Sequence, residues 1–193
     1  VDYFRRYVDL NKLKSFSMYV EPAERGINMI KDFLPHANSV LLGLIPNGKA
    51  ENIEFLSKSD EAITVRFKYK YSEGECEVKY DFKFRIKKPG EIIFSLNEES
   101  FRREIGPGYK QTFMGNGRSF EIEDPLKVSI RRFLGAINGY NTLLVEKKEI
   151  LENIALTEQI VAEYISQEAK QNKLKKTNEK VAVIGGGIFG NSI

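Results

Sequence analysis

Apolar and polar residues alternate along two neighbouring stretches in the first half of the chain. In residues 62–71 (AITVRFKYKY) and 77–86 (EVKYDFKFRI) every second side chain is aliphatic or aromatic, and the others are mostly charged. The glycine-containing segment SEGE, residues 72–75, separates the two stretches. Alternation of this kind is typical of a strand with one buried face, and two such strands joined by a short turn form a hairpin. The sequence therefore predicts a long antiparallel hairpin with one apolar and one charged face.

Further strands are expected on both sides of this hairpin. GEIIFSL (90–96) and GRSFEIE (117–123) have the composition of strands, and so does the apolar and aromatic segment 1–20. The glycine-rich segment GYKQTFMGNGR (108–118) is too irregular for a phosphate-binding loop. We interpret it as a connection between strands at the edge of a pocket. Together these segments predict a large, mostly antiparallel open sheet.

Helices are expected before and after the sheet. Proline suits the first turn of a helix, so Pro35 places the start of the first helix near Leu34, and the apolar pattern continues to about Leu44. A second helix is expected to begin with Asp124 as its N-cap and Pro125 as its first helical residue. A third helix is expected from about residue 146 to residue 167.

The second and third helices each carry one apolar stripe. The stripe of the second helix contains Leu126, Ile130, Phe133, Leu134, Ile137 and Tyr140. The stripe of the third contains Ile150, Ile154, Thr157, Val161 and Ile165. Both have the width expected for packing on a sheet face. The predicted fold class is therefore α+β, a large mostly antiparallel open sheet with helices packed on one face.

Composition excludes several classes of function. The net charge of +3 is too small to indicate a nucleic-acid partner, and no apolar run approaches the roughly 18 residues that span a membrane. Cys76 is the single cysteine, which excludes an intrachain disulfide and a thiolate metal cluster and fits a reducing cytoplasm. No metal site is expected. The basic run at 170–180 is either a patch for an acidic partner or, as we favour, a solvated linker.

The charged face of the predicted hairpin also admits two interpretations. It is either a surface for an anionic ligand or another subunit, or a solvated face, which acidic neighbours such as Asp81 favour. Its basic residues are Arg66, Lys68, Lys70, Lys79, Lys83 and Arg85.

His36, the single histidine, is the first candidate for chemistry. Histidine is the side chain that ordinarily titrates near neutral pH, which makes it the natural carrier of a proton. At the first turn of the predicted helix, the positive end of the helix dipole would favour the neutral imidazole. Asp32, four residues earlier, could orient the ring. The alternative is that His36 is a packing residue at the start of the helix.

Three segments of the chain resemble a known family. DFLPHANSVLLGL (32–44), DPLKVSIRRFLGAINGY (124–140) and EILENIALTEQIVAEYIS (149–166) are similar to the substrate domain of the Gfo/Idh/MocA oxidoreductases. In that family the D-x-x-x-H element, matched here by Asp32 and His36, carries a catalytic histidine. Leu34 and Ser39 stand where many members have glycine and aspartate.

The resemblance covers about residues 1–167 and implies further expectations. In the family an N-terminal nucleotide-binding domain holds NAD or NADP and supplies a catalytic lysine, and an α/β domain with an open sheet binds the substrate. For this chain the resemblance implies a sugar, polyol or related hydroxy compound as substrate, and a missing nucleotide-binding domain as partner. It also implies a homo-oligomer formed through the sheet, such as a dimer. The segment FRRY (4–7) resembles the family's first strand after the nucleotide-binding domain, which makes Arg6 a candidate for substrate binding.

The end of the sequence carries a second candidate motif. After a polar linker at 168–179, the segment KVAVIGGGIFGNSI (180–193) contains the pattern G-x-G-x-x-G at Gly185, Gly187 and Gly190. These glycines follow a strand-like segment, as in dinucleotide-binding loops. The segment resembles the start of FAD-dependent oxidoreductases of the D-amino-acid-oxidase type. The alternative is a flexible glycine-rich tail.

The sequence thus leaves three functional hypotheses. We favour part of a longer NAD(P)-dependent dehydrogenase, inactive without its cofactor domain and either with or without an adjoining FAD-dependent domain. In the second hypothesis the sheet domain is a non-catalytic interaction or scaffold module attached to a flavin-dependent enzyme. In the third the flavin half carries the only activity.

Overall fold

The computed structural model describes the backbone of residues 4, 9, 12–87, 89–140 and 145–190. The side chains of residues 109, 171–172 and 174–190 lie outside the description. The chain divides into two compact units, residues 1–157 and residues 158–193. The first unit contains the whole sheet.

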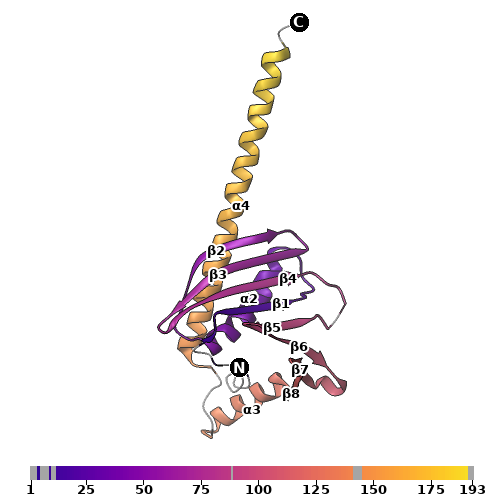
Figure 1. The fold of residues 1–193 in the computed structure, drawn as a ribbon, viewed down its shortest axis with the longest axis vertical. Coiled ribbons are helices and arrows are strands. Elements are labelled where there is room, and N and C mark those ends of the chain that lie inside the picture. Colours follow the sequence, from indigo (N-terminus) through magenta and orange to yellow (C-terminus); the bar gives the residue numbers. More distant parts are fainter. Residues whose placement is uncertain (1–3, 5–8, 10–11, 88, 141–144, 191–193) are drawn as a thin grey trace. The chain divides into compact units, whose positions relative to one another are not determined.

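The sheet has eight strands in the order β2-β3-β4-β1-β5-β6-β7-β8 (Figure 1). The strands are β1 Ser15–Val20, β2 Lys49–Lys58, β3 Ala62–Tyr71, β4 Gly74–Lys83, β5 Ile92–Leu96, β6 Glu99–Ile105, β7 Gln111–Gly115 and β8 Arg118–Ile122. Within the described residues β1 and β4 form the single parallel pair, and all other neighbours are antiparallel. The predicted fold class, α+β with a mostly antiparallel open sheet, is confirmed.

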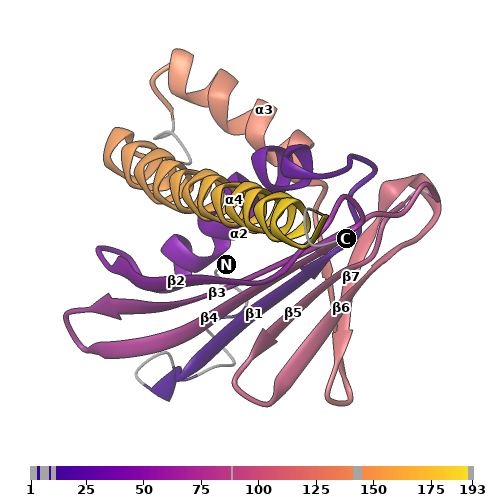
Figure 2. The same cartoon turned by 90° about the horizontal axis from the view of Figure 1, so that it is seen from above.

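The central strands bury one face against the helix α2, Ile27–Leu44. Along β1, β3 and β4 alternate side chains are buried, as the predicted hairpin requires. The ring of Tyr80 packs edge-on against Phe67 at 5.5 Å and against Phe16 at 6.2 Å. Figure 2 shows α2 lying across this face of the sheet. The aromatic residues of the hairpin therefore form the core between sheet and helix.

A second aromatic cluster covers the strands at the other end of the sheet. The ring of Phe4 lies 5.3–6.0 Å from those of Phe94, Phe101, Phe113 and Phe120, in edge-to-face geometry. All five side chains are buried. Edge-to-face contacts stabilise aromatic pairs beyond the area they bury. One residue near the start of the chain thus joins four strands of the sheet.

The helix α2 is longer than the sequence predicted. It begins at Ile27, so Pro35 lies in its middle and the predicted start near Leu34 is wrong. The hydrogen bond that Pro35 removes would have used the carbonyl of Lys31, an exposed residue. The buried face, from Met29 to Leu44, stabilises the helix through packing that outweighs the proline.

Three strands were missed in the sequence: β2, β6 and β7. β7 lies in the glycine-rich segment that we predicted to be a connection. The turn from β7 to β8 is Asn116-Gly117, and both residues have positive φ, 51° and 70°. An Asn-Gly pair with these dihedrals is a strong signal for a hairpin, and it was present in the sequence. β2 was missed because its alternation of apolar and polar residues is interrupted near Asn52, where its register with β3 shifts.

The helix α3, Pro125–Ile137, begins as predicted but does not pack as predicted. The Asp124 side chain accepts a hydrogen bond from the Leu126 amide, and Pro125 occupies the first turn. However, α3 has no buried residue, and Phe133 is 56% exposed. Helical spacing reports an apolar stripe, but it does not report whether another element covers that stripe.

The last helix, α4, spans Lys147–Gly190 and differs from the prediction in two ways. Ile150 and Ile154 of the predicted stripe are exposed, and Leu156 is buried instead. The backbone of 180–190 is helical, in place of the predicted strand and glycine loop.

Candidate functional site

The predicted acid–base pair, Asp32 and His36, lies on the exposed side of α2. Both residues are exposed, and the four-residue spacing puts them on one helix face. The His36 ring lies 6.0 Å from the Phe33 ring, with 59° between their planes. Because α2 begins at Ile27, His36 is in the helix interior, and the predicted effect of the N-terminal dipole on its imidazole does not apply.

The structure leaves the His36 imidazole open to an incoming molecule. Among the described residues no hydrogen bond joins His36 to Asp32, so orientation of the ring by this carboxylate stays a prediction. An exposed imidazole can exchange a proton with a bound hydroxyl compound or with water.

A polar connection between α2 and α4 lies beside this pair. Nδ2 of Asn153, on α4, donates hydrogen bonds to the Pro35 carbonyl at 2.9 Å and to the Ser39 hydroxyl at 2.7 Å. The Thr157 hydroxyl donates to Asn153 Oδ1 at 3.3 Å. These contacts fix the first turns of α4 against the middle of α2.

The connection continues into the core through a fully buried amide. Asn38 Nδ2 donates to Thr157 Oγ1 at 3.0 Å, and the hydroxyl of the buried Tyr80 donates to Asn38 Oδ1 at 3.2 Å. Burial raises the pKa of Tyr80 well above its ordinary value, so the phenol keeps its proton and remains a donor. Asn38 is the one buried polar residue in the described part of the chain. We did not predict this network. The available signal was a single amide on an otherwise apolar helix face.

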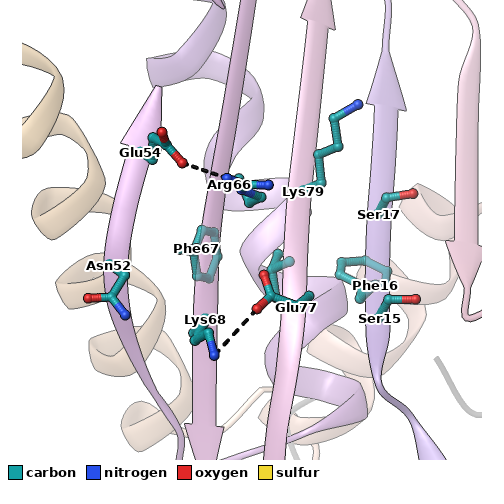
Figure 3. A pocket seen from close by; sticks show the side chains of 11 residues that line it. Ser15, Phe16, Ser17, Asn52, Glu54, Arg66, Phe67, Lys68, Glu77 and Lys79 are labelled. Carbon is teal, nitrogen blue, oxygen red and sulfur yellow. Dashed lines mark hydrogen bonds and ion pairs between the residues drawn. The ribbon is translucent and has the colours of Figure 1, made fainter. Parts of the chain in front are cut away.

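A shallow hollow of about 610 Å³ lies on the opposite, open face of the sheet (Figure 3). The outward side chains of β1, β2, β3 and β4 surround it, including Ser15, Ser17, Asn52, Arg66 and Lys79. His36 does not line this hollow, since α2 covers the other face. The hollow and the proposed acid–base pair are therefore separate features.

Several basic side chains around the hollow are paired with acidic neighbours. Arg66 bonds to Glu54 at 2.7 Å, and the hydrogen bond and the charge of that carboxylate raise the pKa of Arg66. Lys68 lies 3.4 Å from Glu75 and Lys70 lies 2.7 Å from Glu51, both across neighbouring strands, while Lys79 pairs with Asp81 on its own strand. This pairing supports the interpretation of a solvated charged face, because the cations already have counter-ions.

The roles of the other predicted site residues, Arg6 and the three glycines, stay predictions. Arg6 lies outside the described residues. Gly185, Gly187 and Gly190 lie in the helical second unit, and their use in an FAD site stays a prediction. The described part of the chain has no group of three or more acidic, histidine or cysteine side chains placed to hold a metal ion. Nor does it contain a helix with the length and apolar character needed to cross a membrane.

Comparison with known proteins identifies relatives by structure. Neither a protein-family model nor a curated protein matches the sequence. A protein from Desulfitobacterium hafniense, described as a proposed NADPH-dependent oxidoreductase, matches 86% of this chain with a TM-score of 0.54 at 10% identity. A proposed oxidoreductase from Bacteroides fragilis matches 86% (TM-score 0.52, 10% identity), and an oxidoreductase from Thermotoga maritima matches 82% (TM-score 0.54, 9% identity).

The chain therefore has the fold of one part of these oxidoreductases. It spans 59%, 57% and 54% of the three solved chains, respectively. The predicted resemblance to the Gfo/Idh/MocA substrate domain is thus confirmed as a shared fold. At 9–10% identity the likeness shows the fold and does not transfer an activity or a substrate.

Proposed function

We propose that this chain is the substrate-binding and oligomerisation domain of an NAD(P)-dependent oxidoreductase that acts on a sugar, polyol or related hydroxy compound. The observation that carries the proposal is the fold, shared with three oxidoreductases. The exposed Asp32 and His36, on a single face of α2, support it because such a site needs an accessible proton carrier. The cytoplasmic location that we propose with it follows from the single cysteine, which fits a reducing compartment.

The chemical role that we assign to this chain is proton transfer. Oxidation of a hydroxyl to a carbonyl removes one proton from oxygen and one hydride from carbon. In the proposal His36 accepts the proton, Asp32 orients the imidazole, and Arg6 contacts an anionic group of the substrate. A bound nicotinamide would take the hydride. The described residues form no glycine loop between a strand and a helix, so the proposal assigns that cofactor to another domain.

The proposed partners are a nucleotide-binding domain and further copies of the chain. The exposed apolar side of α3 supports a partner domain, because a surface helix ordinarily packs its apolar stripe against another element. Oligomerisation through the sheet is proposed from the resemblance alone. A downstream FAD-dependent domain, whose first strand and glycine loop would be residues 180–193, belongs to the same proposal as a separate cofactor site.

The test is NAD(P)-dependent oxidation of sugars and polyols by the longer protein that joins this chain to a nucleotide-binding domain. We expect His36→Ala to lower kcat by about 10²–10⁴-fold, the usual contribution of a general base. Lys31→Ala, at an exposed position of the same helix, is the control and should keep full activity. The 193-residue chain alone should turn over no polyol with added NAD(P), and measurable turnover would refute the proposal.

A second candidate is a non-catalytic scaffold module. It is favoured by the fact that the hollow on the sheet does not contain His36. In this case His36→Ala leaves the activity of the longer protein unchanged. Flavin absorbance of that protein, measured beside the NAD(P)-dependent rate, separates a flavoenzyme with an attached scaffold from a dehydrogenase.

A further inference from the structure

Pro35 interrupts the hydrogen bonding of α2 at the turn that carries Asp32 and His36. Proline has no N–H, so the carbonyl of Lys31, four residues earlier, lacks its usual helical donor. Asp32 and His36 lie on the two sides of this gap in the sequence. The separation of their side chains therefore depends on how the turn around Pro35 is held.

Asn153 holds this turn from outside the helix. One side-chain amide group donates to the Pro35 carbonyl at 2.9 Å and to Ser39 Oγ at 2.7 Å. The two acceptors lie on either side of His36 in the sequence, one residue before it and three residues after it. An amide nitrogen has two hydrogens, and both are used here. A side chain of α4 thus anchors the turn that follows Pro35, although neither of its bonds goes to the Lys31 carbonyl.

Asn153 is itself fixed by the buried network. Its Oδ1 accepts from Thr157, which accepts from Asn38, which accepts from Tyr80 on β4. All the donors point the same way along this chain, from the sheet towards Pro35. Hydrogen bonds in such a series polarise one another, and the buried Asn38 within it has both its amide oxygen and its amide nitrogen bonded. The position of the Asn153 amide is therefore determined by the core.

We propose that Asn153 is a positioning residue for His36. By holding the Pro35–Ser39 turn, it fixes the distance and direction of the imidazole relative to Asp32. Asn153 acts through the backbone of α2 and has no contact with the reacting atoms. The inference rests on the proposed function only for its catalytic consequence, because the geometric effect can be measured on the isolated chain.

His36 is the only histidine, so its two ring C–H groups give unambiguous NMR signals. The experiment compares the ¹H–¹³C imidazole signals of the full 193-residue chain with those of Asn153→Ala and Asn153→Leu. Alanine is a good helix former, and leucine keeps most of the volume, so at least one variant should fold. Thr64→Val is the matched control, because it removes a side-chain hydrogen bond to Asp81 in the sheet, away from α2.

We expect both Asn153 variants to shift or broaden the His36 ring signals, while Thr64→Val leaves them in place. The Ser39 amide, which pairs with the Pro35 carbonyl in an α-helix, should exchange its hydrogen about tenfold faster, as expected for the loss of one to two net hydrogen bonds. In addition, Asp32→Asn should perturb the His36 signals in the wild-type chain and perturb them less in the Asn153→Ala background.

The inference is overturned if the Asn153 variants are less stable but keep the His36 signals and their response to Asp32→Asn. Asn153 would then be a structural residue only. In the longer enzyme, Asn153→Ala should lower kcat with little change in KM, as expected for a misplaced acid–base group. If the His36 signals move but His36→Ala keeps full activity, the positioning inference holds and the proposed function fails.

Discussion

The buried hydroxyl of Tyr80 offers a direct test of the polar network. Tyr80→Phe keeps the ring and its contacts with Phe16 and Phe67, so no cavity larger than one oxygen forms. It removes the donor to Asn38 Oδ1, and Asn38 is fully buried. The variant therefore isolates the effect of leaving one buried acceptor without a partner.

The expected cost follows from the geometry. An unsatisfied buried acceptor costs about 1–3 kcal/mol. The oxygen–oxygen distance of 3.2 Å is long for a hydroxyl donor, which places the expected loss in the lower part of that range, about 1–2 kcal/mol. For a chain of this size, such a loss lowers Tm by about 2–8 °C.

The assay is urea unfolding followed by far-UV circular dichroism, because the chain has no tryptophan to report by fluorescence. The slope of the transition should stay unchanged, so that the shift in midpoint reports stability. Asn38→Leu combined with Tyr80→Phe should cost less than the sum of the single variants by about 1 kcal/mol, because the two residues share one bond.

Two results would refute this reasoning. A loss below about 0.5 kcal/mol for Tyr80→Phe would mean that water or another group satisfies Asn38. Additive single variants would mean that the Tyr80–Asn38 bond is not formed in solution.

The remaining predictions concern acid stability, thiol reactivity and the apolar side of α3. Burial alone would raise the pKa of Glu21, but hydrogen bonds from the Glu91 amide, the Arg85 guanidinium and the Tyr19 hydroxyl outweigh it, and the pKa is lowered from 4.5. The ionised Glu21 carboxylate therefore stabilises the fold fully above pH 4.5. This stabilisation is lost as the pH falls through the lowered pKa that Glu21 has in the folded chain. Glu21→Gln should be about 1–2 kcal/mol less stable than the wild-type chain at neutral pH. In acid-unfolding curves this difference in stability should vanish at low pH, and a constant difference down to about pH 2 would contradict the prediction. Burial raises the pKa of the Cys76 thiol to about 12, so a thiol reagent at pH 8 should label the native chain at the rate of unfolding; immediate labelling would show that Cys76 is accessible. Phe133→Glu, on the exposed side of α3, should change the free energy of unfolding by less than about 0.5 kcal/mol. Phe101→Ala, at a side chain only 2% exposed, should lower it by about 3–5 kcal/mol. Equal losses of the two variants in urea unfolding would mean that another element packs on α3.

Local patterns in the sequence predicted the elements whose structure depends on near neighbours. The alternation in 62–71 and 77–86 predicted the central hairpin, because side chains two residues apart in a strand share a face. Asp124 and Pro125 predicted the start of α3, because an N-cap acts within one turn. The D-x-x-x-H spacing put Asp32 and His36 on one helix face for the same reason.

Contacts between distant segments could not be predicted from such patterns. Pro35 indicated a helix start, but the buried face of α2 extends the helix through it. The stripe on α3 indicated packing, yet nothing in the described structure buries it.

The polar network beside His36 illustrates the difference most clearly. Asn153 and Pro35 are 118 residues apart in the sequence, and each lies in a helix with an ordinary amphipathic pattern. Hydrophobic periodicity reports which side of a helix avoids water, but it carries no information about the partner or its rotation. The central hairpin, the helix cap and the candidate acid–base pair follow from short-range rules. The bond from Asn153 that holds the His36 turn depends on how α4 packs against α2, which only the folded chain specifies.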